Sequence, residues 1–134
     1  MSAPSDDEAL IEAAKAVRAR AHAPYSHYHV GSAVLDENGR IHSGCNVENA
    51  AYPLGICAET SAIGAMVAAG GTRIVAIAAV GGRQDLEACT PCGGCRQRIR
   101  EFADGNTRII LLDAQGRPRR YTMDELLPAS FRLT

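Results

Sequence analysis

Two short segments of the chain carry thiol and carboxylate side chains at a spacing suited to metal-assisted chemistry. The first is Cys57-Ala58-Glu59, and the second is Pro91-Cys92-Gly93-Gly94-Cys95, whose first cysteine follows Cys57 by 35 positions. The gap of two residues between Cys92 and Cys95 allows both sulfur atoms to reach one ion, and Cys57 would supply a third ligand. Three protein ligands leave one tetrahedral position for water, which is the pattern of catalytic zinc and not of closed structural zinc.

Glu59 stands two residues after the first of these cysteines. Zinc lowers the pKa of bound water and so provides a nucleophile near neutral pH. A carboxylate on the first helical turn beside the metal can take a proton from that water and deliver it to a ring nitrogen of a bound substrate. Cys57 and Glu59 together therefore predict a hydrolytic site.

Both cysteine segments open predicted helices, over residues 57–69 and 92–102. Backbone amides and the helix dipole favour anions at a helix N-terminus, so thiolates form readily there and bind metal.

The remaining elements must bring these two helix starts together. We expect a helix over 5–22 with Ser5 and Glu8 at capping-box spacing, strands over 29–35 and 40–46 joined through Asn38-Gly39, strands over 73–80 and 108–112, and a short helix over 122–127 capped by Thr122. Strands that alternate with helices predict one layered α/β domain over residues 1–134.

Charge and hydropathy narrow the classes of function. The 14 Lys and Arg and the 15 Asp and Glu side chains are interspersed, with a formal net charge of −1, which argues against a nucleic-acid partner. The acidic start lacks an apolar signal core, and no apolar run approaches the ~20 residues that span a bilayer. We therefore expect a cytoplasmic protein without membrane or nucleic-acid partners.

The five cysteines leave two other interpretations open. An odd number without a signal peptide argues against a disulfide framework, and clustered cysteines in a reducing compartment favour metal binding or catalysis. Cys92 and Cys95 could instead form a thiol redox pair, or Cys89 could join them in a structural four-sulfur zinc site. Either arrangement would leave Glu59 without a task, and Cys45 is expected to be a small packing residue.

The combined motifs resemble the zinc-dependent cytidine deaminases. Cys-Ala-Glu with Pro-Cys-x-x-Cys is similar to the zinc nucleobase deaminases, and cysteine as the first ligand points to the cytidine deaminases among them. Segments 24–31, 44–52, 95–97 and 127–131 agree, so the resemblance runs from about residue 8 to 131. It implies a three-layer α/β/α fold with a mixed central sheet of about five strands, Zn²⁺ as the cofactor, and a homotetramer.

The same resemblance implies roles for residues outside the metal motif. Asn46 and Glu48 would bond the ribose hydroxyls, and Ala58 would line the substrate site with them. Tyr28 stands where the family usually has Phe against the pyrimidine ring, and Phe131 resembles the tail aromatic that reaches a neighbouring subunit's site.

Tyr28 is one departure from the family pattern, and a second one changes the charge beside the metal. Thr60 stands where many relatives have Arg, and three thiolates on Zn²⁺ leave a net charge of −1 that an arginine would offset. We place Arg96 and Gln97 directly behind the ligands and hypothesise that Arg96 contacts a zinc thiolate in compensation.

The expected reaction is hydrolytic deamination of free cytidine and deoxycytidine to uridine and deoxyuridine plus ammonia, as in pyrimidine salvage. Tyr28 and Thr60 keep open an alternative, a deaminase of a modified cytosine nucleoside or of a blasticidin-type antibiotic.

Overall fold

The computed structural model describes residues 4–133, with side chains described from Asp6 onward. Its strands are β1 (His29–Asp36), β2 (Ile41–Cys45), β3 (Ile74–Gly82), β4 (Arg108–Leu112) and β5 (Pro118–Thr122). Its helices are α1 (Pro4–Arg18), α2 (Ala58–Ala68), α3 (Gly93–Phe102) and α4 (Met123–Leu126), with a short 3₁₀ helix, η1, at Tyr52–Leu54. None of the helices described between residues 4 and 133 is long and apolar enough to cross a membrane.

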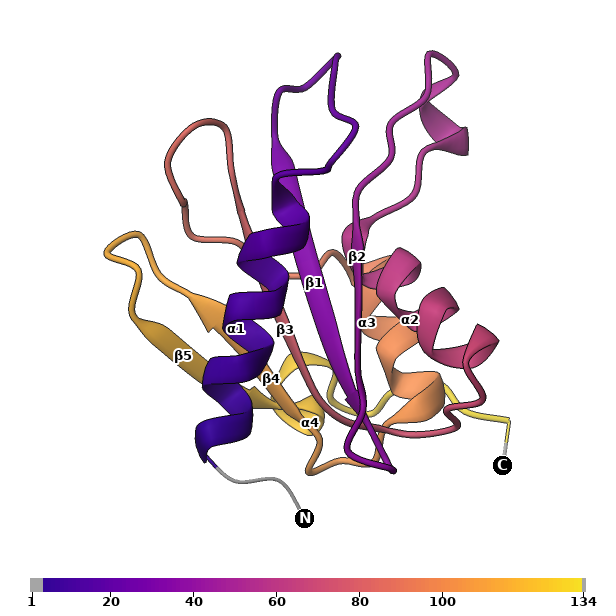
Figure 1. Cartoon of the computed structure of the whole chain (residues 1–134). Coiled ribbons are helices and arrows are strands. Elements are labelled where there is room, and N and C mark those ends of the chain that lie inside the picture. Colours follow the sequence, from indigo (N-terminus) through magenta and orange to yellow (C-terminus); the bar gives the residue numbers. More distant parts are fainter. Residues whose placement is uncertain (1–3, 134) are drawn as a thin grey trace.

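The five strands form one sheet in the order β2-β1-β3-β4-β5 (Figure 1). β1 pairs antiparallel with both β2 and β3, and β5 pairs antiparallel with β4. β3 and β4 are parallel, with α3 in the connection between them. The sheet is therefore mixed, as predicted. The turn between β1 and β2 contains Gly39 at a φ of 78°, the left-handed conformation that the Asn38-Gly39 signal favours.

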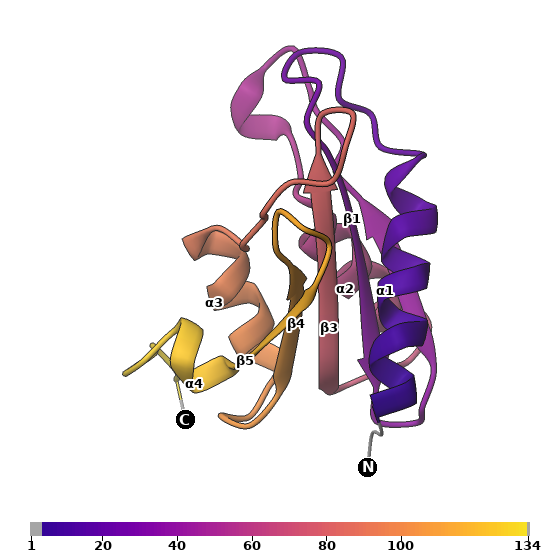
Figure 2. The same ribbon diagram turned by 90° about the vertical axis from the view of Figure 1, so that its left-hand side faces the viewer.

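Helices cover both faces of this sheet (Figure 2). Alternate residues of a strand point to opposite faces, and β3 shows this directly. Ile77 and Ala79 pack with α2, α3 and α4, whereas Ala76, Ala78 and Val80 pack with α1. The predicted three-layer α/β/α fold with five strands is thus confirmed.

Two glycines allow the helices to approach the sheet closely. A Cβ atom on Gly31 of β1 would lie 2.0 Å from the carbonyl oxygen of Ala14 in α1. A Cβ atom on Gly44 of β2 would lie 2.4 Å from the backbone nitrogen of Ala62 in α2. Because α2 begins at the predicted metal ligands, the contact at Gly44 fixes the height of that helix start above the sheet.

A buried carboxylate joins α1 to the far edge of the sheet. Asp7 is 2% exposed, and its two oxygens accept hydrogen bonds from Arg108 Nη2 of β4 at 2.5 Å and Arg120 Nε of β5 at 2.7 Å. Burial raises the pKa of Asp7, but the hydrogen bonds and charges of Arg120 and Arg108 together hold it below its ordinary value.

The structure differs from the sequence prediction at two elements, and the Ser5 cap lies outside the described side chains. α1 ends at Arg18 and not at residue 22, because the chain leaves the helix there to join a distant loop. The backbone N–H of His22 donates to the carbonyl of Asn46 at 3.0 Å. β5 was not predicted from its pattern, since Arg119 and Arg120 hide the alternation expected of a strand.

Candidate active site

The three predicted metal ligands meet at the N-termini of two helices. Cys57 is the N-cap residue of α2, and Cys92 is the N-cap residue of α3, where its sulfur accepts a hydrogen bond from the backbone N–H of Cys95 at 3.4 Å. The sulfur atoms of all three lie within 4.8 Å of one another. Over residues 4–133, no other group of three His, Cys, Asp or Glu side chains is gathered in this way.

This set of donors fits zinc. Sulfur atoms at about 2.3 Å from a tetrahedral ion lie about 3.8 Å apart, so the observed grouping needs little adjustment. Three thiolates are ligands that zinc accepts readily, and both helix dipoles favour their charge. Cys89 lies outside the group, so the four-sulfur alternative lacks its fourth ligand among the described residues.

The thiols interact with each other and with a neighbouring hydroxyl. A hydrogen bond between Cys57 and Cys95 lowers the pKa of Cys57 and raises the pKa of Cys95. Thr60 brings its Oγ1 to 3.9 Å from the sulfur of Cys95. The group that the residue after Glu59 places beside the thiols is therefore a neutral hydroxyl.

Glu59 lies in the first turn of α2 and is only 5% exposed. Burial raises the pKa of its carboxyl, although a hydrogen bond from its own backbone N–H lowers it in part. A carboxyl whose pKa is raised accepts a proton more readily than an exposed glutamate does, which suits acid–base work.

A cleft of about 570 Å³ brings the predicted residues together. Eight of them line it, namely Tyr28, Asn46, Glu48, Cys57, Ala58, Glu59, Cys92 and Cys95. Arg96, Gln97 and Phe131 are not among its lining residues. The structure thus places the metal ligands, the buried carboxylate and the sugar-binding candidates around one cavity.

Asn46 already uses part of its amide within the chain. Its Oδ1 accepts from the backbone N–H of Val30 at 2.9 Å, and its Nδ2 donates to the carbonyl of Tyr28 at 2.8 Å. One N–H and one lone pair of this side chain stay available for a ligand. The two backbone bonds fix the orientation of the amide in advance.

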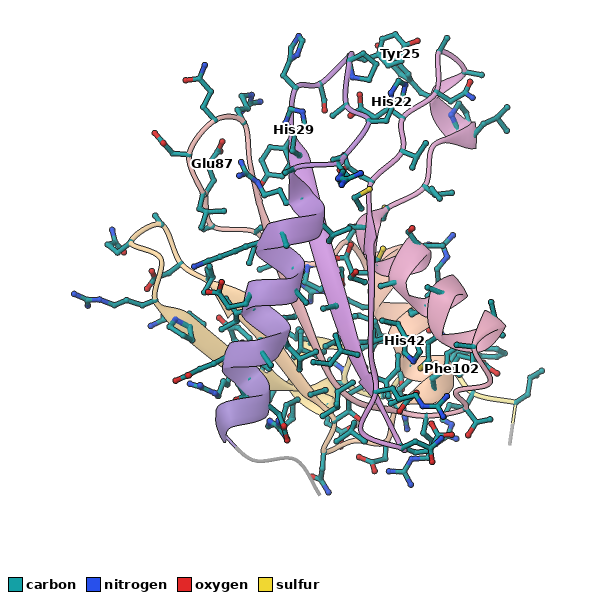
Figure 3. The ribbon with its side chains drawn as sticks, in the orientation of Figure 1. His22, Tyr25, His29, His42, Glu87 and Phe102 are labelled. Atoms are coloured by element: carbon teal, nitrogen blue, oxygen red, sulfur yellow. The ribbon has the colours of Figure 1, made fainter. Side chains whose placement is uncertain are left out.

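Glu48 is held in the same way by the loop that follows α1. One oxygen accepts from the backbone N–H groups of Tyr25 at 3.0 Å and Ser26 at 3.1 Å, and the other accepts from the Ser26 hydroxyl. These hydrogen bonds lower the pKa of Glu48 and keep its carboxylate charged, and the bond from the Ser26 hydroxyl has the largest effect. His22 and Tyr25 lie on this loop near the upper end of the molecule (Figure 3).

The pocket also contains a pair that the sequence did not reveal. Burial, and after it the neighbouring thiol of Cys89, raises the pKa of Tyr28 to about 12. The guanidinium carbon of Arg83 lies 5.8 Å from the centre of the Tyr28 ring. A Cβ on Gly81 would lie 3.0 Å from the Tyr28 ring and 3.1 Å from the Cys89 sulfur, so glycine leaves room for the pair. No spacing rule connects these residues, which only the fold brings together.

Arg96 and Gln97 donate hydrogen bonds to backbone carbonyls. Arg96 donates through Nε to the carbonyl of Pro91 and through Nη1 to that of Leu126, each at 2.9 Å. Gln97 donates to the carbonyl of Phe131 at 3.1 Å. Two N–H donors of Arg96 therefore bind backbone carbonyls and not the zinc thiolate that we hypothesised as their partner.

Comparison with known proteins agrees with this site. The family model described as the cytidine and deoxycytidylate deaminase zinc-binding region matches residues 4–111, which include all three cysteines and Glu59. A cytidine deaminase of Sporosarcina psychrophila is 41% identical over 127 residues, covering 94% of this chain and 91% of that protein. A cytidine deaminase of Mycobacterium tuberculosis is 42% identical over 115 residues, covering 86% and 81% respectively.

A solved structure extends the similarity to three dimensions. The crystal structure of cytidine deaminase from Burkholderia pseudomallei matches with a TM-score of 0.84 and 43% identity, covering 92% of this chain and 98% of that chain. The match of the family model over most of the chain, with relatives above 40% identity, leads to one assignment. The chain belongs to the cytidine and deoxycytidylate deaminase family, whose shared region binds zinc.

Proposed function

We propose that the protein hydrolyses cytidine and deoxycytidine to uridine and deoxyuridine with release of ammonia. The observation that carries this proposal is the composition of one cleft, where a group of three thiols stands beside the buried carboxyl of Glu59. The names of the relatives in Sporosarcina psychrophila and Mycobacterium tuberculosis support the choice of substrate.

Cys57, Cys92 and Cys95 would hold the zinc ion as thiolates. Bound there, zinc supplies Lewis-acid chemistry that makes water nucleophilic near neutral pH. The helix N-termini at Cys57 and Cys92 offset part of the thiolate charge.

Glu59 moves the protons of the reaction. Its carboxylate takes a proton from the attacking water and delivers it to N3 of the pyrimidine, while the water oxygen bonds to C4. It then carries the second water proton to the exocyclic amine, and the C4–N4 bond breaks to release ammonia. Water and cytidine thus give uridine and ammonia with no other reactant, and the burial of Glu59 suits a group that is protonated and deprotonated in each cycle.

Asn46 and Glu48 would bond the ribose hydroxyls, with Ala58 and Tyr28 forming the adjoining walls of the cleft. Their hydrogen bonds to the chain support this role, because groups held in advance lose little freedom when a ligand binds. A nucleoside lacking the matching hydroxyl would leave one of these polar groups unpaired.

The proposal includes a homotetramer in which Phe131 reaches a neighbouring subunit's cleft. Large apolar side chains lie exposed near the cleft and on the tail, with Tyr52 at 76%, Leu54 at 70% and Phe131 at 68%. Exposed large apolar side chains are frequent at protein–protein interfaces, so these positions favour a partner. Clustered free thiols persist most readily in a reducing compartment, which supports cytoplasmic pyrimidine salvage as the setting.

The alternative substrate, a modified cytosine nucleoside or an antibiotic, is not favoured. It depended on Tyr28 and Thr60, two departures from the family pattern that could change the pocket. The relatives that match most of the chain are named cytidine deaminases, which supports the ordinary nucleoside. We therefore propose the unmodified nucleosides alone.

The test is the ultraviolet absorbance of the purified protein with cytidine and with deoxycytidine, with zinc measured on the same sample. Loss of the cytosine band at about one zinc per chain supports the proposal. A zinc-loaded protein that leaves both nucleosides unchanged would contradict it.

A further inference from the structure

Helix α3 carries three side chains that hold the C-terminal tail, here residues 126–133. Arg96 Nη1 donates to the carbonyl of Leu126 at 2.9 Å, and Gln97 Nε2 donates to the carbonyl of Phe131 at 3.1 Å. Arg100 Nε donates to the hydroxyl of Ser130 at 2.9 Å. We call Arg96, Gln97 and Arg100 the tail clamp.

The clamp begins at the metal site. α3 starts directly after Cys92, and Arg96 follows Cys95 along the helix. The same guanidinium that holds Leu126 donates through Nε to the carbonyl of Pro91 at 2.9 Å. One side chain therefore joins the loop of the metal ligands to the tail.

Leu126 and Leu127, at the base of the tail, pack against the core, whereas the residues beyond them form no regular element. Residues 128–133 lie in no helix or strand, and Ala129 has a φ of 51°, a left-handed conformation that is unfavourable for a residue with a Cβ. Phe131 is 68% exposed, so its ring does not anchor the segment within this chain. The side chains that bond the carbonyls and the hydroxyl of the tail are those of the clamp.

We propose that Arg96 and Gln97 are positioning residues, which set the tail so that Phe131 is presented to the cleft of a second copy of the chain. This inference rests on the proposed function, in which Phe131 completes a neighbour's site. Gln97 acts through the backbone of Phe131 itself, and Arg96 ties the base of the tail to the loop before Cys92. The helix that carries two metal ligands in one subunit thereby also determines the shape of the substrate site in the next.

The experiment compares Gln97→Met, Phe131→Ala and the double variant in the zinc-loaded full chain. Methionine keeps the length of the side chain and removes the donor. Glu101→Met, an exposed position on the same helix, is the matched control, and Gln97→Lys restores a donor. KM and kcat for cytidine are measured together with hydrogen exchange of the tail amides.

We expect Gln97→Met to raise KM about five-fold with kcat nearly unchanged, in the same direction as Phe131→Ala. The double variant should show no further rise beyond Phe131→Ala, because both changes remove one contribution. Exchange of the tail amides should be faster in Gln97→Met, while Gln97→Lys recovers most of the effect and Glu101→Met matches the parent protein.

Two results would overturn the inference and leave the proposed function intact. In the first, Gln97→Met keeps the parental KM and the parental rate of tail amide exchange, while Phe131→Ala raises KM. The other is effects that add fully in the double variant, which would separate Gln97 from Phe131. If the parent protein is zinc-loaded and inactive, the proposed function is wrong. The clamp can then still be tested without activity, because tail amides that exchange at the parental rate in Gln97→Met would reject it.

Discussion

Glu59 and Tyr28 illustrate how single side chains in the cleft receive their properties from their surroundings. Both carry acidic groups whose pKa is raised first of all by burial. Glu59 is set beside the three thiols, where a proton can be exchanged with a substrate. Tyr28 lies beside Cys89, and its pKa of about 12 keeps its hydroxyl protonated at neutral pH.

Replacement of Glu59 by glutamine should separate metal binding from turnover. Glutamine keeps the shape of the side chain but cannot carry a proton, so kcat should fall by at least about 10²-fold. The cysteine ligands are untouched, and the zinc content should stay at the parental level. Atomic absorption and the rate of cytosine loss on one sample check this, and substantial turnover in the metal-replete variant would remove the proton-transfer role.

Tyr28→Phe should have a small effect on turnover, because the ring that lines the cleft is kept and the lost hydroxyl carries no charge at neutral pH. Loss of the hydroxyl beside the half-buried Cys89 should cost at most about 1 kcal/mol of unfolding free energy. Activity on cytidine should stay within a few-fold of the parent. Urea unfolding and steady-state rates measure the two effects, and a large change in KM would show that the hydroxyl contacts the substrate.

At the scale of the elements, the position of the site depends on how closely α2 approaches β2. Gly44 provides the space for this contact, and Gly64, in the middle of the same helix, has open space around it. Substitution by alanine is therefore expected to have opposite effects on stability at the two glycines.

Gly44→Ala should destabilise the fold by about 2 kcal/mol or more and lower the affinity for zinc, since the added methyl would push the helix of Cys57 away. Gly64→Ala should instead stabilise by up to about 1 kcal/mol, because alanine favours the helix and meets nothing. Unfolding midpoints and zinc competition with a chelator measure both, and equal effects at the two positions would refute the packing argument.

At the scale of the whole molecule, the α/β order, the paired cysteine segments and Glu59 followed from local patterns in the sequence. The period of the hydrophobic residues and the spacing of the ligands are local properties, so they can be read from the sequence without knowledge of the fold. The early end of α1 depends on a bond between His22 and Asn46, and the proximity of Tyr28 and Cys89 depends on the space left by Gly81 in β3. Contacts between segments distant in sequence leave no such local signal.

The ion pairs of Asp7 predict how the whole fold responds to acid. Its folded pKa is below the unfolded value of about 3.9, so the carboxylate stabilises the fold at neutral pH. That contribution is lost as the pH falls through the folded pKa. Asp7→Asn should therefore lower the unfolding free energy by about 2 kcal/mol at pH 7 and by less near pH 3, which lies below the unfolded pKa.

Urea unfolding of the parent protein and Asp7→Asn at both pH values provides the measurement. Glu12, an exposed acidic residue of the same helix, provides the control through Glu12→Gln. A difference between parent and Asp7→Asn that stays constant with pH would show that packing, and not charge, accounts for the loss.

The placement of the three thiols on two helix starts has a mechanical consequence. Cys57 and Cys95 are separated by a complete strand, so an ion bound by both would act as a reversible cross-link across that part of the chain. Closing a loop of this length removes conformational entropy from the unfolded chain worth about 4 kcal/mol in the simplest treatment. Chelation should accordingly lower the melting temperature as well as stop turnover, and the same atoms that serve the chemistry would tie the two halves of the sheet together.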